Sequence, residues 1–418
     1  MRSSRLALGI GSCGLRAAVL LGLLASSAAA QAGSPAGPVP VERLLARRAA
    51  LLGRLGEGVA VIGAAKLRSI EGDYPQDSDY RESNDFFYLT GLEAPGARLV
   101  LIARERGADS AILYLPEPSE GHDRWTGGSP GPGAEVSRLT GIEDVRFLRD
   151  SVRIAGRRRS PAPISAREVA AELATLRQIK DAEEIRRLRR AVAITAEALL
   201  EAMRAAEPGM YEYELEALIE YGFRSRGAER VGFPSIVGSG PNGTILHYDE
   251  SRRRMAEGEL VVIDVGAEFG YYTADLTRTL PVSGRFTPRQ RELYDLVLGA
   301  QQAALDSVRA GADLGTLNRI ARAHMRAHSG ALCGGSGCER YFIHGLSHWL
   351  GMDVHDPGAY SRPLEPGMVL TVEPGIYIPA ESLGIRIEDV VLVTGGGREV
   401  LSSALPRTAE AVERAMAR

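Results

Sequence analysis

The chain has 418 residues, of which 44% are hydrophobic and 25% charged, and its formal net charge at pH 7 is −3. This composition is typical of a globular protein, and the length exceeds what a single core comfortably holds, so two domains are expected. A net charge so close to zero gives no reason to expect a nucleic acid or an anionic membrane as a partner.

The first thirty residues have a composition of their own. They carry Arg2, Arg5 and Arg16, no acidic residue, and an apolar run over 17–24 that is followed by A-S-S-A-A-A. These features are typical of a secretory signal peptide, and the apolar run is too short to span a bilayer. We therefore expect removal of residues 1–30, no membrane anchor, and a secreted or periplasmic protein. A mitochondrial transit peptide is the alternative, because the segment is basic and free of acidic residues.

The segment 31–174 reads as a first domain of mixed helix and strand. Its pattern predicts a helix over 42–55, a strand over 59–63, and further strands at D-Y-R-E-S-N-D-F-F-Y-L-T-G-L, A-R-L-V-L-I-A and S-A-I-L-Y-L-P. A long helical pattern follows in R-Q-I-K-D-A-E-E-I-R-R-L-R-R. Because its charges alternate in sign at helical spacing, we expect Asp181, Glu183, Glu184 and the arginines to form a solvated face.

The segment 175–418 reads as a second domain, in which strands dominate after residue 240. Helices are expected at 213–222, 288–310 and 314–329. Cys333 and Cys338 lie in L-C-G-G-S-G-C-E, where an oxidising compartment would permit a disulfide. Two free thiols are the alternative, because spacing alone does not fix the geometry.

Two aspartates lie in neighbouring strand-like segments of the second domain. Asp264 lies in the apolar segment V-V-I-D-V, and Asp275 follows in Y-Y-T-A-D-L-T. A hairpin that turns at Phe269 and Gly270 would place the two carboxylates opposite each other on one face, with Cβ atoms about 5 Å apart. Two exposed aspartates are the alternative, but a carboxylate inside an apolar strand needs a partner.

A similar arrangement recurs near the C-terminus, in M-V-L-T-V-E-P-G-I-Y-I and G-I-R-I-E-D-V-V-L-V. Glu373 and Glu388 lie almost symmetrically about the loop between these two strands, so we expect them to face each other. Arg386 is two residues before Glu388 and shares its face, where it could orient a carboxylate. A salt bridge between Arg386 and one of the two glutamates is the alternative.

Four of the seven histidines lie in short motifs of the second domain: His247, His344, His348 and His355. Four carboxylates around one imidazole would repel one another unless cations lay between them. Oxygen ligands with a single nitrogen suit Mn²⁺ or a similar divalent ion better than a structural zinc. The sequence therefore predicts a pair of metal ions, which indicates hydrolysis. The remaining histidines could bind substrate or move protons.

Five blocks in order along the chain carry a resemblance to a known family. They are G-S-G-P-N-G-T-I-L-H-Y, V-I-D-V-G with Y-T-A-D-L-T-R-T, H-G-L-S-H-W-L-G-M-D-V-H-D, L-E-P-G-M-V-L-T-V-E-P-G-I-Y-I, and G-I-R-I-E-D. They resemble the pita-bread metallopeptidases and, among these, the aminopeptidase P group. Y-R-E-S-N-D-F-F-Y-L-T-G-L-E-A-P-G-A and D-R-W-T-G are similar to the N-terminal domain of that group. The resemblance implies an α/β (α+β) fold, with a creatinase-like α/β domain at 31–174 and a pita-bread catalytic domain at 175–418.

The resemblance also implies which residues hold the metal. The residues that match the ligands of two metal ions are Asp264, Asp275, His348, Glu373 and Glu388. Among them Asp275 and Glu388 match the ligands that bridge both ions, and Glu373 also matches the catalytic proton acceptor.

Other residues match positions that contact the substrate. His247 and His355 match catalytic residues that bind substrate and stabilise the transition state, and His344 lines the same site. Arg386 is also expected among the substrate-binding residues.

The activity implied by the resemblance is that of an aminopeptidase that hydrolyses the N-terminal Xaa-Pro bond of peptides. We expect two Mn²⁺ per subunit, with Co²⁺ or Zn²⁺ as alternatives, and a homo-oligomer, either a dimer or a tetramer. One alternative is a prolidase, which needs a cation such as Arg362 or Arg386 to take the dipeptide carboxylate. Another is a non-catalytic binding module on the same fold, although such proteins typically lose metal ligands.

Overall fold

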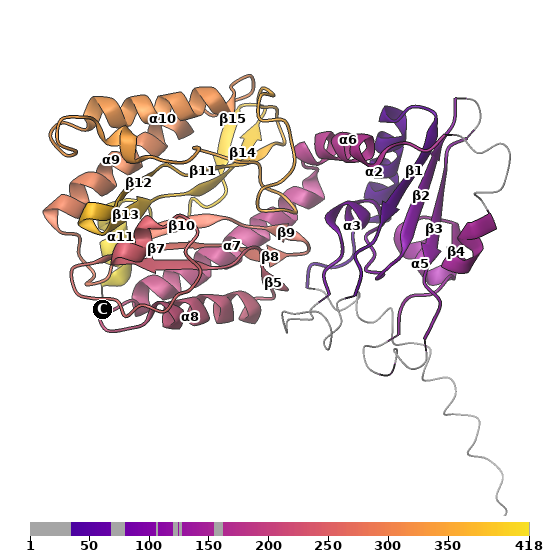
Figure 1. The fold of residues 1–418 in the computed structure, drawn as a ribbon, viewed down its shortest axis with the longest axis horizontal. Coiled ribbons are helices and arrows are strands. Elements are labelled where there is room, and N and C mark those ends of the chain that lie inside the picture. Colours follow the sequence, from indigo (N-terminus) through magenta and orange to yellow (C-terminus); the bar gives the residue numbers. More distant parts are fainter. Residues whose placement is uncertain are drawn as a thin grey trace, which may run out of the picture.

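The computed structural model describes residues 35–67, 80–105, 108–119, 124, 128–153 and 162–417. These residues form two bodies of mixed helix and strand, joined by helices α6 (Ala166–Gln178) and α7 (Ala182–Ala205) (Figure 1). The α/β (α+β) class expected from the sequence is thereby confirmed. The expected signal segment at 1–30 lies outside the described residues, as does most of D-R-W-T-G. Within the described part of the chain, no helix has the length and apolarity needed to cross a membrane.

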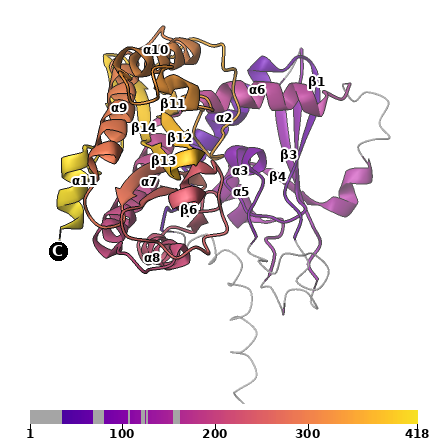
Figure 2. The same cartoon turned by 60° about the vertical axis from the view of Figure 1, so that its left-hand side comes forward.

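The N-terminal body is built on a four-stranded sheet whose strands follow chain order. The strands are β1 (Gly58–Gly63), β2 (Arg98–Ala103), β3 (Ser110–Leu115) and β4 (Asp144–Phe147). Strands β1 to β3 pair antiparallel, and β4 pairs parallel with β3. One face is buried by alternate residues such as Leu99 and Leu101. The helices of this body are α2 (Val41–Arg54), α3 (Asn84–Thr90), α5 (Ala134–Thr140) and α6 (Figure 2), with a 3₁₀ turn at Leu148–Arg153.

One segment of this body differs from the sequence prediction. D-Y-R-E-S-N-D-F-F-Y-L-T-G-L, expected as a strand, contains helix α3. The Ser83 side chain caps the helix by accepting a hydrogen bond from the Phe86 amide at 3.4 Å, and Gly91 ends it in the left-handed conformation with φ 62°. The aromatic residues that favoured a strand are buried in this helix, because core contacts override the weak strand preference of aromatic side chains.

The C-terminal body places its strands between two pairs of helices (Figure 1). One pair is α7 with α8 (Glu212–Ser225), and the other is α9 (Pro288–Leu305) with α10 (Leu314–His328); α11 (Ala409–Met416) contacts α7 and α9. The helices expected from the sequence are confirmed, with ends that differ by a few residues. The strands are β5 (Arg230–Val231), β6 (Ile236–Ser239), β7 (Leu260–Val265), β8 (Ala267–Phe269), β9 (Tyr272–Thr273), β10 (Leu276–Pro281), β11 (Val369–Val372), β12 (Gly375–Ile378), β13 (Leu383–Arg386), β14 (Asp389–Thr394) and β15 (Gly397–Val400).

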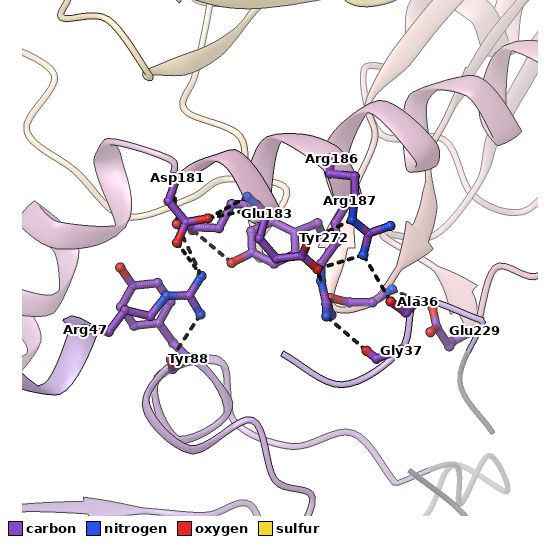
Figure 3. Close-up of polar contacts among 12 residues, drawn as sticks. Ala36, Gly37, Arg47, Tyr88, Asp181, Glu183, Arg186, Arg187, Glu229 and Tyr272 are labelled. Atoms are coloured by element: carbon purple, nitrogen blue, oxygen red, sulfur yellow. Dashed lines mark hydrogen bonds and ion pairs between the residues drawn. The ribbon is translucent and has the colours of Figure 1, made fainter. Parts of the chain in front are cut away.

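The charged start of α7 is only in part the solvated face that the sequence predicted, because Arg186 and Arg189 are exposed but other members of the face are buried. Asp181 caps the helix, whereas Glu184 and Arg187 are only 2% and 1% exposed. They are buried because the start of α7 lies between the two bodies. Arg47 of α2 lies 3.3 Å from Asp181 (Figure 3) and 3.4 Å from Glu184. Alternating charge at helical spacing therefore marks an ion-paired contact between the two bodies here.

The junction between α6 and α7 ties the two bodies together. The domain boundary expected between residues 174 and 175 falls inside α6, and it stays a prediction. Arg177 donates hydrogen bonds to Asp85 of α3 at 2.9 Å and to Asp356 of the C-terminal body at 2.7 Å. Lys180 donates to the same Asp356 at 3.1 Å. Burial works against ionisation of Asp356, but Lys180 and Arg177 hold its pKa below the ordinary value.

The two cysteines of the C-terminal body form a disulfide. Cys333 and Cys338 are bonded across a loop whose ends have Cα atoms 5.2 Å apart, and both side chains are buried. Of the two alternatives drawn from the sequence, the structure therefore has the disulfide. It lies next to the 3₁₀ turn Cys338–Tyr341, which precedes the histidine-rich block.

Candidate metal centre and active site

The first pair of carboxylates lies on a long hairpin. Strands β7 and β10 pair antiparallel, so that Asp264 lies opposite Thr277. Asp275 is two residues before Thr277 and therefore lies diagonally across from Asp264. Because an offset of two residues keeps a side chain on the same face of a strand, both carboxylates still point to one side.

The turn of this hairpin lies one residue later than predicted. The sequence suggested a turn at Phe269 and Gly270, with Asp264 directly opposite Asp275. In the structure β8 and β9 pair with Phe269 opposite Tyr272, so Gly270 and Tyr271 form the turn. The predicted direct pairing is wrong, but the shared face is not affected.

The second pair of carboxylates lies where two strand pairings meet. Strand β11 pairs with β14, with Val372 opposite Asp389, and β12 pairs with β13, with Gly375 opposite Arg386. The same register passes through Glu373 and Glu388, which therefore lie across from each other. The symmetry that the sequence predicted about this loop is present.

His348 joins the two carboxylate pairs. Its Nδ1 lies 3.1 Å from the Trp349 carbonyl oxygen, which can only accept, so Nδ1 carries the proton. The unprotonated Nε2 then points at Asp275 and Glu373, at 3.3 and 3.4 Å. This orientation leaves a nitrogen lone pair among the carboxylates.

The charges of this cluster fit a divalent cation. Burial raises the pKa of Asp275, Glu373 and Glu388; the charge of Glu388 raises those of the first two further, and Asp264 contributes to raising that of Glu388 to about 7. One oxygen each of Asp264, Asp275 and Glu388 is buried without a hydrogen-bond partner. Ligand atoms of Asp275, His348 and Glu388 lie within 4.8 Å of one another. Unpartnered carboxylate oxygens that converge with an imidazole nitrogen are what a divalent ion would satisfy.

Arg386 lines the same cluster, and each of its three nitrogens already donates a hydrogen bond. It is 3% exposed and donates to Asp264 at 2.6 Å, to the Tyr377 hydroxyl at 2.7 Å and to Thr277 at 3.2 Å. Its ion-pair partner is therefore Asp264, whereas the alternative drawn from the sequence was a salt bridge with Glu373 or Glu388.

A hydrogen-bond chain leads from Arg386 to His344. His344 Nδ1 donates to the Gly345 carbonyl at 2.8 Å, so its Nε2 accepts from the Tyr377 hydroxyl at 2.9 Å. Burial, followed by the charge of Arg386, lowers the pKa of His344 to about 4. His344 is therefore neutral at pH 7, with Nε2 held as an acceptor.

His355 and His247 lie at the exposed side of the site. The His355 ring packs edge-on against His348, with centroids 4.4 Å apart. Burial lowers the pKa of His355, and the neighbouring His348 and His247 lower it further. The next residue, Asp356, is anchored to the α6–α7 junction, which fixes the backbone that carries His355.

A single cavity of about 470 Å³ gathers all the site residues predicted from the sequence. They are Asp264, Asp275, His348, Glu373, Glu388, His247, His344, His355 and Arg386. Arg362, proposed for the prolidase alternative, is not among the lining residues.

Sequence reasoning missed several residues of the site. Thr277 donates to Glu388 at 2.7 Å, and Tyr377 links Arg386 to His344. Thr277 is two residues after Asp275, and Tyr377 is four residues after Glu373. Because side chains an even number of residues apart share one face of a strand, this period could have identified both. Nothing in the sequence marks the apolar wall of the cavity, which includes Phe233, Pro234, Ile236, Leu246 and Val354.

Comparison with known proteins shows the family to which the chain belongs. The family model for metallopeptidase family M24 matches residues 186–395, and the model for the aminopeptidase P N-terminal domain matches residues 45–158. The Xaa-Pro aminopeptidase of Escherichia coli K12 is 36% identical, over 88% of this chain and 96% of the relative. The mitochondrial intermediate cleaving peptidase 55 of Arabidopsis thaliana is 32% identical, over 90% of this chain and 83% of the relative. The structure of aminopeptidase P from E. coli with the inhibitor Pro-Leu has a TM-score of 0.81 and 33% identity, covering 91% of this chain and 99% of that chain.

These matches span both bodies and include the segment that carries the carboxylates and histidines of the cavity. The chain belongs to metallopeptidase family M24, within its aminopeptidase P group.

Proposed function

We propose that the protein is a metallo-aminopeptidase that hydrolyses the bond between the first residue of a peptide and a proline in the second position. One observation carries the proposal: four carboxylates and one imidazole converge in a cavity that also holds three further histidines. The bond before proline is a tertiary amide with no N–H and a fixed ring, which ordinary peptidase clefts handle poorly.

We propose two divalent ions per subunit, Mn²⁺ first and Co²⁺ or Zn²⁺ as alternatives. Asp264, Asp275, His348, Glu373 and Glu388 would hold them. One oxygen each of Asp264, Asp275 and Glu388 lacks a partner, and the Glu373 carboxylate lies 3.4 Å from the His348 nitrogen that points at the cluster. When bound, the metal supplies polarisation of the scissile carbonyl and lowers the pKa of the attacking water.

Glu373 is proposed as the proton acceptor. Its carboxylate accepts a hydrogen bond from Thr371 at 3.3 Å, and burial raises its pKa well above the ordinary value, which suits a group that takes up a proton. His247 and His355 would contact the substrate and stabilise charge that develops on it. Neutral His344 would line the site as a fixed hydrogen-bonding group, and Arg386, whose donors are occupied, would act by orienting Asp264.

The positions of the positively charged side chains favour an aminopeptidase over a prolidase. A prolidase binds the substrate carboxylate through a cation in the cavity. Among the described residues that line the cavity, the one arginine or lysine is Arg386, which is paired with Asp264. Arg362 contacts Glu365 at 2.6 Å and Gln178 at 3.3 Å. All five candidate ligands are present, which speaks against a non-catalytic binding module.

A comparison of peptides tests the activity. Metal-loaded protein is expected to cleave Xaa-Pro-Yaa tripeptides and longer peptides well and Xaa-Pro dipeptides more slowly, and amidation of the tripeptide C-terminus should have little effect. A strict preference for dipeptides that Arg362→Ala abolishes would identify a prolidase instead.

The compartment and assembly are proposed from weaker signals. The basic start, apolar run and small-residue site over 1–30 favour export to the periplasm or the medium. The mitochondrial name of the Arabidopsis relative keeps a mitochondrial location as the alternative. We retain a homo-oligomer, a dimer or tetramer, as the proposed assembly.

A further inference from the structure

The tip of the hairpin that carries Asp264 and Asp275 has an unusual backbone. Gly270 and Tyr271 form its two-residue turn, and both have positive φ, 57° and 73°. A glycine in the first position suits a turn in which only that residue has positive φ. Tyr271 nevertheless also adopts the left-handed region, which costs free energy for a residue with a side chain. Contacts made by Tyr271 must therefore offset this cost.

Those contacts come from the N-terminal body. The Tyr271 ring stacks on Phe87 of α3, with centroids 3.7 Å apart and planes 11° apart. Its hydroxyl donates to Glu93 at 2.6 Å and accepts from the Glu82 amide at 3.0 Å. The Arg81 guanidinium lies 5.0 Å from the ring centroid. These partners contact both the ring and the hydroxyl, so the N-terminal body holds the Tyr271 side chain, and with it the tip of the hairpin, in one position.

The residues that flank Tyr271 are held in the same way, mostly by α7. The Gly270 carbonyl accepts from Arg187 at 3.0 Å, and the Tyr272 hydroxyl donates to Glu184 at 2.9 Å. Glu184 in turn lies 3.4 Å from Arg47 of the N-terminal body. A Cβ added to Gly270 would come within 2.7 Å of the Arg187 side chain, so the turn has no room to rearrange around a larger residue.

The tip is coupled to the carboxylates through an unbroken register. The pairing of Phe269 with Tyr272 at the tip and of Asp264 with Thr277 at the base belong to one antiparallel register. A turn longer or shorter by one residue would shift the pairing by one and turn Asp275 to the opposite face of the strand, away from the cavity. The residue that fixes the turn therefore also fixes which side chains face the site.

We propose that Tyr271 is a positioning residue, through which the N-terminal body holds the hairpin in the register that presents Asp264 and Asp275 to the metal. The inference rests on the proposed metal binding by these carboxylates. It assigns the N-terminal body a part in forming the metal site, in addition to its own packing.

The test measures binding of Mn²⁺ alone to chelator-treated full-length protein by calorimetry, together with the thermal unfolding temperature. Tyr271→Ala is expected to weaken Mn²⁺ binding by about 10-fold or more, the usual effect of removing a group that orients a ligand. Tyr271→Phe keeps the ring stack and is expected to retain most of the affinity. Tyr271→Gly permits positive φ but removes the ring, and should bind as weakly as Tyr271→Ala.

Asp85→Asn is the matched control. Asp85 pairs with Arg177 at 2.9 Å between α3 and α6 without touching the hairpin. Its substitution is expected to lower the unfolding temperature while leaving Mn²⁺ affinity unchanged, since it weakens the contact of α3 with α6 and leaves the contacts of the hairpin in place.

The outcomes separate this inference from the proposed function. If wild-type protein binds Mn²⁺ and Tyr271→Ala or Tyr271→Gly binds it equally well, Tyr271 is only a packing residue. Should Tyr271→Ala not fold, Tyr271→Gly decides alone, and wild-type affinity in that variant would overturn the proposal in the same way. A wild-type protein that binds no Mn²⁺ would refute the proposed function and this inference together.

Discussion

Replacement of Glu388 by glutamine should make the metal-free protein more stable at neutral pH. Glu388 is 1% exposed, and burial followed by the charge of Asp264 raises its pKa from 4.5 to about 7. Between these two pH values the folded protein holds a proton that the unfolded chain has released. Stability therefore falls as pH rises through this window, because the folded state binds more protons than the unfolded state.

The size of the effect follows from the two pKa values. One pKa unit corresponds to about 1.4 kcal/mol, so the rise from 4.5 to about 7 amounts to a penalty of about 3 kcal/mol above pH 7. Glutamine carries no charge, and its amide oxygen can still accept the hydrogen bond from Thr277. In chelator, Glu388→Gln should thus match wild type near pH 4.5 and exceed it by up to about 3 kcal/mol at pH 8.

Urea unfolding in the presence of a chelator, at several pH values between 4.5 and 8, measures this difference. The order should reverse when Mn²⁺ is added, because wild type gains binding energy that the variant has lost. Lower stability of Glu388→Gln than of wild type at pH 8 in chelator would show that Glu388 is not destabilised by burial and its neighbours.

Three further predictions concern the metal, the histidines and the N-terminus. Dialysis against a strong chelator should abolish hydrolysis and Mn²⁺ should restore it; full activity in protein shown by elemental analysis to be metal-free would contradict the proposed centre. His355→Ala and His247→Ala should each lower kcat by about 10²–10⁴-fold with metal content kept, as expected for groups that polarise or transfer protons; loss of metal from His355→Ala would place that residue among the ligands. N-terminal sequencing of protein from its native compartment should begin at or near Gln31, and an intact Met1 would exclude removal of the segment.

Much of the candidate site was predictable because its carboxylates and histidines lie in short sequence motifs. Carboxylates inside apolar strands need partners, and the two-residue period of a strand shows which of them share a face. This reasoning brought Glu373 across from Glu388 correctly. It failed by one residue at the turn between Asp264 and Asp275, because contacts of Tyr271 with the N-terminal body decide that turn and local preference does not.

The remaining errors have the same origin in contacts between distant segments. Helix α3 was predicted as a strand from its aromatic residues, although Ser83 and Gly91 at its ends are standard capping residues. Glu184 and Arg187 were predicted to be solvated, since a helical charge pattern looks the same on a free surface and on one covered by a second body. The partner of Glu184 is more than a hundred residues away, in α2, and Arg187 donates to the carbonyl oxygens of Gly37 and Gly270.

The buried ion pairs of Asp356 bear on how substrate can enter. Arg177 and Lys180 lie at the junction about which the N-terminal body would have to swing, and both bind Asp356, the residue that follows His355. A hinge motion there would separate buried charges, which costs several kcal/mol when one partner is left unpaired. Opening or closing of the cavity by a swing about this junction is therefore disfavoured by the cost of separating these charges. For the proposed aminopeptidase, this would leave the selection of peptides to the shape of the entrance as the structure has it.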